Sequence, residues 1–405
     1  MAASAGWMGE AVSIAVRGVT LLAVSTVLGV AIGATPVSVS SAAAGPALRA
    51  TQPVDFVVPL AGRPRVSAGA GATIPMWTDS VTASQNGKRY RYQMVGQDPR
   101  NRLSHPTMTI VANIIPIVVT LADGTTFDPT STSCAEKTTP LNAVLASPIF
   151  NNTVFSPGGT TVGDTQYLDA FQRANFWTYT NPAGINPAYH ILLRPKVGKT
   201  ITIKVPAADG QVISRHSCAA AEVTMAYAVA QGLKLIPSLA AEPWGVNPTT
   251  FPIFLLHNVE FDPTLGVAGS VGFHAAIPNP AFHGATQTVA VASYLDATIS
   301  PHESDIAVLS HEIGEWINDP LGTNPTPPWG NVGQVERHCQ ANLEVGDPLT
   351  GTTFPVTRDG VTYHPQELAF FSWFFGPVAS TGVNGWFSFN GTFTRPAPLC
   401  PPGGQ

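Results

Sequence analysis

The most constraining feature of this sequence is the segment SDIAVLSHEIGEWIND, residues 304–319, which combines an apolar stripe with ionisable side chains. Its apolar residues recur at intervals of three and four, which predicts an α-helix with one buried face. The first two residues of the segment are suited to an N-cap, and Pro320 would end the helix. His311, Glu312 and Glu315 therefore interrupt a helix that otherwise belongs in a core.

The spacing of these three residues is typical of a metal site. His311 and Glu315 are four positions apart and share one face of the helix, with Glu312 beside them. In H-E-x-x-H metallopeptidases two such residues bind zinc and the intervening Glu activates a water molecule. Carboxylate oxygen binds zinc at much the same distance as imidazole nitrogen, and it also suits harder ions. We therefore expect one divalent cation, with zinc favoured and manganese or calcium as alternatives, and Glu312 as the catalytic base.

The competing interpretation of this motif is an ordinary solvated helix face. Charged residues make up only 11% of the chain, so an acidic cluster within an apolar helix is unusual here. We favour the metal hypothesis for that reason.

A cation held by two side chains needs a third ligand, and the following segment offers two. Glu344 is the first candidate and His338 the alternative, while a loop acid capping a turn is the non-metal interpretation of Glu344. Asp347 is placed to accept a proton from the other ring nitrogen of His311 and so fix its tautomer. Asp319 is expected to cap the end of the helix.

Composition excludes one large class of function. The formal net charge is −5, which argues against nucleic-acid binding through phosphate neutralisation. Gly and Pro number 37 each, which predicts a loop-rich but folded chain.

The N-terminus resembles an export signal. Residues 18–34 carry no charge and are followed by a small-residue cleavage motif, which predicts a signal peptide over 1–44 and a flexible leader over 45–75. A retained membrane anchor is the alternative, although the segment is at the short limit for spanning. We expect a secreted or extracytoplasmic protein that has no membrane segment after signal removal.

The chain has four cysteines, an even number, and no two of them form a C-x-x-C pair. In an oxidising compartment this pattern favours two disulfides over a thiolate metal site. Three pairings are possible. We favour Cys134–Cys218 with Cys339–Cys400, because each would connect a loop-rich region to itself.

The remaining pattern mixes strands and helices, with an N-terminal, mainly β region over 76–210 and the motif-bearing region over 211–405. Residues 107–121 are expected to form two buried strands broken at Pro116. The other elements we expect are helices over 164–177 and 219–235, and strands over 189–193, 200–205, 250–261 and 286–294.

The run SHEIGEWINDPLGTNPTPPWGNVGQVE, with CQANLEVGDPLTG after it, resembles a group of secreted bacterial proteins that share an H-E-x-x-E-x-x-x-D-P core. It is more distantly similar to the plant phosphate-induced, exordium-like proteins, in which a Glu-Ile-Ala-Asp-like string matches residues 344–347. The resemblance covers about residues 250–400, with DAFQRANFW near 170. It implies a metallopeptidase-like domain over 211–405. The expected fold is α+β, with a zincin-like mixed sheet and an active-site helix.

Two functions from different classes follow. The first is an exported metal-dependent hydrolase, a peptidase using metal-activated water, with a peptide or an envelope polymer as substrate. The second is a non-catalytic extracellular or envelope protein with a structural cation site or no metal.

Several other polar and aromatic side chains could line a cleft, although core or rim positions are the more common fate of such residues. They are His274, Tyr294, Tyr363, His364 and Glu367. The aromatic run over 370–375 is expected to be core, with a glycan platform as the alternative.

Overall fold

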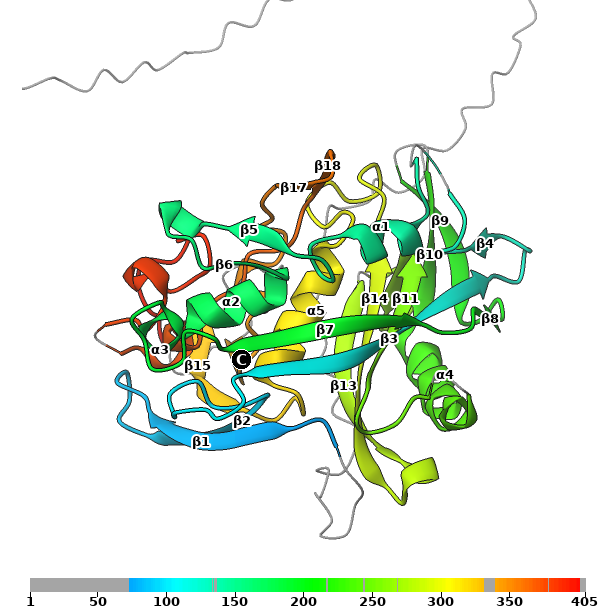
Figure 1. The fold of residues 1–405 in the computed structure, drawn as a ribbon. Coiled ribbons are helices and arrows are strands. Elements are labelled where there is room, and N and C mark those ends of the chain that lie inside the picture. Colours follow the sequence, from blue (N-terminus) through cyan, green and yellow to red (C-terminus); the bar gives the residue numbers. More distant parts are fainter. Residues whose placement is uncertain are drawn as a thin grey trace, which may run out of the picture. The chain divides into compact units, whose positions relative to one another are not determined.

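The computed structural model describes residues 73–132, 134, 137–215, 218–242, 245–267, 269–330, 339–377 and 379–400 (Figure 1). The predicted signal peptide and most of the predicted leader lie outside these residues. The described elements belong to one compact unit and include both helices and sheets, so the α+β class is confirmed.

A mixed seven-stranded sheet organises the fold around β3, Thr107–Thr120. Five strands run parallel within it. Strand β11 pairs with both β3 and β14, while β7 and β8 pair with the other edge of β3. Strand β13 closes one edge, antiparallel to β14. The bounds are β4 Thr126–Phe127, β7 His190–Val197, β8 Ile201–Lys204, β11 Phe251–His257, β13 Gly272–Asn279 and β14 Ala285–Tyr294. The two regions predicted from the sequence, 76–210 and 211–405, therefore share one sheet.

The predicted break at Pro116 is wrong, because β3 continues through it. Strand β7 pairs with β3 as far as Ile114, and β8 pairs with it from Ile117 onward. On this edge of β3, Pro116 lies in the gap between the end of β7 and the start of β8. Its missing N–H therefore removes no hydrogen bond to either strand.

The two faces of the sheet bury two separate cores. Along β11, Ile253 and Leu255 point into one core while Phe254 and Leu256 point into the other, as the period of two requires. The first core lies beneath α5, Ala307–Asn318, and α2, Tyr167–Asn175. The second lies beneath α4, Met225–Ser238, seen on the right of Figure 1.

Several element boundaries differ from those predicted. The segment predicted as one helix over 219–235 divides into β10, Cys218–Thr224, and the helix α4. Helix α2 begins at Tyr167 with Gln166 in the N-cap position, and the Gln166 side chain makes no cap hydrogen bond; Asp164 belongs to a short strand. Helix α5 begins at Ala307, about one turn after the start of the predicted segment at residue 304. Asp305 does not cap it, because its side chain binds His364.

Smaller elements surround the two cores. The additional strands are β1 Met76–Thr82, β2 Arg89–Val95, β5 Thr153–Phe155, β6 Gly163–Thr165, β9 Gly210–Arg215, β12 Val259–Asp262, β15 Pro325–Gly330, β16 Cys339–Asn342, β17 Val356–Arg358 and β18 Val361–Tyr363. The additional helices are α1 Pro140–Ala146, α3 Trp177–Thr180 and α6 Phe371–Phe375. The side chains of the aromatic run over 370–375 are buried, which confirms it as core.

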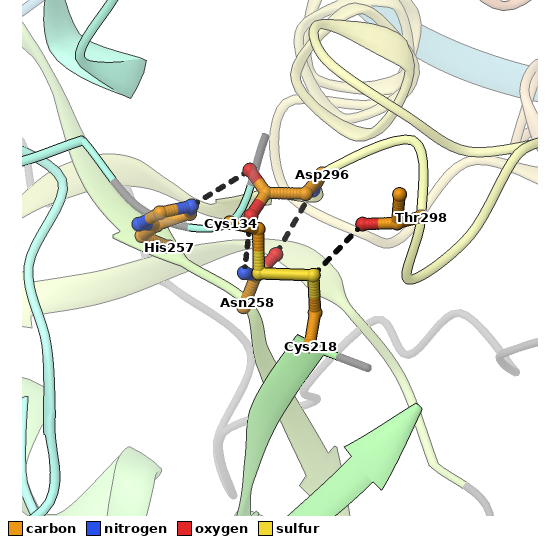
Figure 2. Close-up of a disulfide and its surroundings, with 6 residues drawn as sticks. All are labelled: Cys134, Cys218, His257, Asn258, Asp296 and Thr298. Atoms are coloured by element: carbon orange, nitrogen blue, oxygen red, sulfur yellow. Dashed lines mark hydrogen bonds and ion pairs between the residues drawn. A yellow bond between two sulfur atoms is a disulfide. The ribbon is translucent and has the colours of Figure 1, made fainter. Parts of the chain in front are cut away.

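Both favoured disulfides are present, Cys134–Cys218 and Cys339–Cys400. Figure 2 shows the first beside a buried polar group, in which His257 Nε2 lies 2.9 Å from Asp296 Oδ1. Among the described residues, no helix is long and apolar enough to cross a membrane.

Candidate metal centre

Helix α5 is buried along its whole length, and its ionisable side chains are buried with it. Trp316 anchors the helix to the sheet, because its ring stacks on Phe251 at 3.7 Å between centroids and its Nε1 donates to Thr288 Oγ1 at 3.0 Å. His311, Glu312 and Glu315 are no more than 5% exposed. The helix therefore fixes these three side chains rigidly against strands β13 and β14.

The orientation of the His311 ring is set by Gln366. The side-chain amide of Gln366 donates from Nε2 to the Gly346 carbonyl oxygen at 2.8 Å, which turns Oε1 toward His311 Nδ1 at 3.1 Å. Nδ1 is therefore the donor to Gln366. In the neutral imidazole, the lone pair then lies on Nε2.

The Nε2 atom of His311 faces two carboxylates. It lies 3.2 Å from Glu315 Oε1 and 3.7 Å from Asp347 Oδ1. A tetrahedral ion with bonds of about 2.0–2.2 Å holds its ligand atoms roughly 3.3–3.6 Å apart. The two distances from Nε2 are close to this range, and the ligand atoms of all three residues lie within 4.8 Å of one another.

Backbone geometry at Gly346 brings the loop of Asp347 close to the helix. A Cβ on Gly346 would lie 2.6 Å from His311 Nδ1, so only glycine allows this approach. The N–H groups of Gly346 and Asp347 donate to Glu315 Oε1 at 3.0 and 3.3 Å. Glu315 therefore holds the loop that supplies Asp347.

A second histidine, His274 on β13, enters the same cluster from the sheet. Its Nε2 lies 3.0 Å from the Asp319 carbonyl oxygen, which can only accept, so Nε2 carries the proton. Its Nδ1 faces Glu315 Oε2 at 3.6 Å and Glu312 Oε2 at 3.8 Å. The alternation of β13 explains the placement, since Phe273 and Ala275 on either side point into the other core.

The cluster contains two groups of three possible ligands. They are His311 with Glu315 and Asp347, and His274 with Glu312 and Glu315, and the ligand atoms within each group lie within 4.8 Å of one another. Glu315 belongs to both groups through different oxygens. A carboxylate in this position can bind one cation or bridge two.

Burial removes the ionisable side chains of this cluster from water, which makes their charged forms costly. Glu344 and Asp347 are also buried, at 1% and 2% exposed, so four carboxylates with two imidazoles are removed from water. Nearby, burial raises the pKa of Asp319 to about 6, against the lowering effect of N–H groups from Thr323, Asn324 and Gly322 and of His274. Buried charges are stabilised by paired charges or by metal ions, and a divalent cation would offset the excess negative charge.

The structure rearranges the roles predicted for the third ligand. Asp347, rather than Glu344, completes the group of His311. Glu344 Oε2 lies 3.8 Å from His274 Nε2, and its Oε1 accepts from Asn342 Nδ2 at 3.0 Å. The tautomer-fixing role predicted for Asp347 is performed by Gln366. His338 lies outside the described residues.

The other polar candidates lie in separate contacts. His364 pairs with Asp305 at 2.7 Å, and Glu367 accepts hydrogen bonds from Ser388 and Thr392. The ring of Tyr294 packs against His257, and burial raises the pKa of Tyr363. Asp319 caps the turn after α5 by accepting from the backbone N–H groups of Thr323 and Asn324.

Sequence reasoning gave His274 only a general cleft role and missed Gln366 entirely. No spacing rule connects a strand histidine or a distant glutamine with a helix motif. The sequence Gly346-Asp347-Pro348 carried the one usable signal, since a glycine beside an acid is consistent with close backbone approach.

Comparison with known proteins found no matching family model, no matching curated protein and no matching solved structure.

Proposed function

We propose that this protein is an extracytoplasmic metal-dependent hydrolase with a peptidase-like site on α5. The observation that carries the proposal is the direction of the two imidazole rings. Each has one nitrogen committed to a hydrogen-bond acceptor, and each turns the other nitrogen toward a pair of carboxylates at 3.2–3.8 Å. Two lone-pair-bearing groups at such distances are arranged as ligands around a cation.

His311, Glu315 and Asp347 would hold this cation. One nitrogen and two oxygens form a harder donor set than the imidazole-rich sites of many zinc enzymes, so manganese and calcium remain alternatives to zinc. A divalent cation here would supply Lewis-acid polarisation of a carbonyl and a lower pKa for water.

Glu312 has the position required of a proton acceptor. It follows His311 on the helix, and Gly272 leaves space for its carboxylate, because a Cβ there would lie 2.6 Å from Glu312 Oε1. In the proposed reaction, Glu312 takes a proton from the attacking water and passes it to the leaving amine. The Nδ1 atom of His274 lies 3.8 Å from Oε2 of the same carboxylate.

The mixed sheet with an antiparallel edge strand next to the motif helix supports a zincin-like arrangement. The two disulfides and the apolar segment over 18–34 support export to an oxidising compartment.

A structural cation site is the second candidate. The burial of the cluster favours it, because the most exposed of the side chains, His311, is 5% exposed. A structural ion needs closed coordination, whereas a catalytic ion needs an open position.

Metal content and one charge-neutral variant test both proposals. The purified protein is expected to hold about one equivalent of divalent metal that a chelator removes. Glu312→Gln should retain that metal and lose hydrolysis of a casein or peptidoglycan-peptide substrate by about 100-fold or more. Asp123→Asn, in an exposed turn, removes the same charge elsewhere and should change neither.

The outcomes separate the candidates. Metal present with full hydrolysis in Glu312→Gln removes Glu312 from the mechanism. Metal present with no hydrolysis in the wild type favours the structural site, and protein that binds no divalent ion contradicts both.

A further inference from the structure

An apolar cavity of about 90 Å³ lies between α4 and the sheet, on the face opposite the candidate metal centre. Strand residues form its floor, with Phe254 and Phe273 among them, and α4 forms its roof. An apolar cavity of roughly 150 Å³ stays dry and binds small apolar molecules. The cavity beneath α4 is smaller than this, so it would accommodate only the end of an apolar chain that enters from outside.

The sequence of α4 explains why the space is not filled. Ala228, Gly232 and Leu235 recur at helical spacing and line the cavity from the helix side. A Cβ added to Gly232 would meet nothing within 4 Å. Of the α4 side chains, only Ile236 is fully buried, so the helix covers the sheet without packing closely against it.

The cavity adjoins a groove of about 350 Å³ at the edge of α4, which both polar and apolar residues line. The two spaces are adjacent, because they share lining residues: Ile203, Tyr227, Gln231 and Leu235. Tyr227 ties the helix to β8 by donating to the Lys204 carbonyl oxygen at 2.6 Å. The groove has two charged side chains, Lys204 and Lys234, and both are cationic.

We propose that this site binds a single-chain fatty acid, with the end of the alkyl chain beneath α4, the rest of the chain in the adjoining groove and the carboxylate at Lys204 and Lys234. The chemistry is complementary at both ends, because apolar side chains line the interior and the two lysines are among the residues that line the groove. An apolar interior with a few polar groups is typical of small-molecule sites.

Charge disfavours the segment over 45–72 as the occupant of this site. Residues 45–72 contain three Arg and one Asp, so this segment would bring net positive charge to a lysine-lined mouth. Asp209 accepts a hydrogen bond from Thr224 Oγ1, and it raises the pKa of Tyr227 after the larger effect of burial.

Titration of the full-length mature protein with dodecanoate tests the proposal, with 1-dodecanol as the uncharged probe. Calorimetry should show saturable one-to-one binding of dodecanoate. Lys204→Gln with Lys234→Gln should weaken dodecanoate binding by about tenfold or more, since contacts to charged groups are the strong ones, and should leave 1-dodecanol unchanged. Lys88→Gln, on the exposed β1–β2 hairpin, is the matched charge control.

A cavity-filling variant tests the apolar end. Gly232→Leu should abolish binding of both probes and raise the melting temperature, because it fills the cavity and removes a helix-interior glycine. Ala230→Leu adds a similar side chain on the exposed side of the same helix and should bind dodecanoate normally.

Three results would overturn the proposal. The first is no saturable binding of dodecanoate, and the second is unchanged binding by Gly232→Leu. The third is displacement of dodecanoate by a peptide of residues 45–72, or by self-association of the protein in sedimentation experiments.

Discussion

His274 Nε2 lies 3.0 Å from the backbone carbonyl oxygen of Asp319, the residue at which α5 ends. This bond satisfies a carbonyl that the helix leaves without an intrahelical partner, and it also fixes the tautomer of the ring. His274 thus contacts both the end of α5, at Asp319, and the candidate ligands in the middle of the helix, Glu312 and Glu315.

Replacing His274 with Phe keeps the ring and removes both roles. We expect a loss of about 1–3 kcal/mol in the free energy of unfolding, because a buried carbonyl loses its donor. If His274 also acts through the cation, the stabilisation by added metal will shrink in the variant. Urea unfolding with and without chelator measures both quantities, and an unchanged metal effect would limit His274 to the helix end.

Gly346→Ala should weaken cation binding by about tenfold or more through displacement of a ligand. The backbone of Gly346 has φ −83° and ψ −40°, which alanine adopts freely, so the only conflict is with the His311 ring. Gly330→Ala is the control, since a Cβ there meets nothing within 4 Å. Competition with a chelating dye compares the two, and equal affinities would show that the loop moves aside.

Gln366→Met should reduce metal affinity by about 10–100-fold, which is typical for loss of a hydrogen bond behind a ligating histidine. Gln366→Glu keeps an acceptor for His311 Nδ1 and should retain more affinity than the Met variant. Calorimetric titration with zinc and manganese compares the metal affinities of the wild type and the two variants. A Glu variant weaker than the Met variant would contradict the assigned tautomer.

The pair His364–Asp305 predicts a pH-dependent contribution to stability. The hydrogen bond to Asp305 raises the pKa of His364 above its ordinary 6.5. The contribution is therefore complete below pH 6.5 and lost as the pH rises through the higher, folded-state value. It is small, because the His364 side chain is 40% exposed. Melting temperatures of the wild type and His364→Gln should differ more at pH 5.5 than at pH 9.

The disulfide Cys339–Cys400 closes a loop that contains Glu344, Asp347 and Gln366. Replacing both cysteines with serine should lower the free energy of unfolding by about 2–5 kcal/mol. Metal affinity should fall with it, because the loop that supplies Asp347 would be less constrained. Thiol titration of the native wild type must first show no free cysteine.

The motif helix could be predicted from the sequence, because it depends on local spacing. The sequence left the cysteine pairing open, and the favoured pairing is the one present. Residues 304–319 show their helical period directly, and four cysteines allow three pairings. The strand predicted over 286–294 was correct within one residue for the same reason.

The places of Asp347 and His274 in the cluster could not be predicted, because they depend on tertiary register. His274 reaches the cluster because β13 pairs antiparallel with β14 and so faces α5. Asp347 lies beside His311 Nε2 because Gly346 approaches the His311 ring closely. The division of 219–235 into β10 and α4 was missed because Ala and Val suit either structure until β10 pairs with β9 and β12.

The register of β3 has a consequence for how the chain acquires its structure. Phe251 pairs with Ala112, so the central strand waits for a partner synthesised far later in the chain. Non-local parallel pairing gives slow folding and leaves an apolar strand uncovered in the meantime. We therefore expect Thr107–Thr120 to be prone to aggregation in the nascent chain until the parallel strands that pair with it have been synthesised.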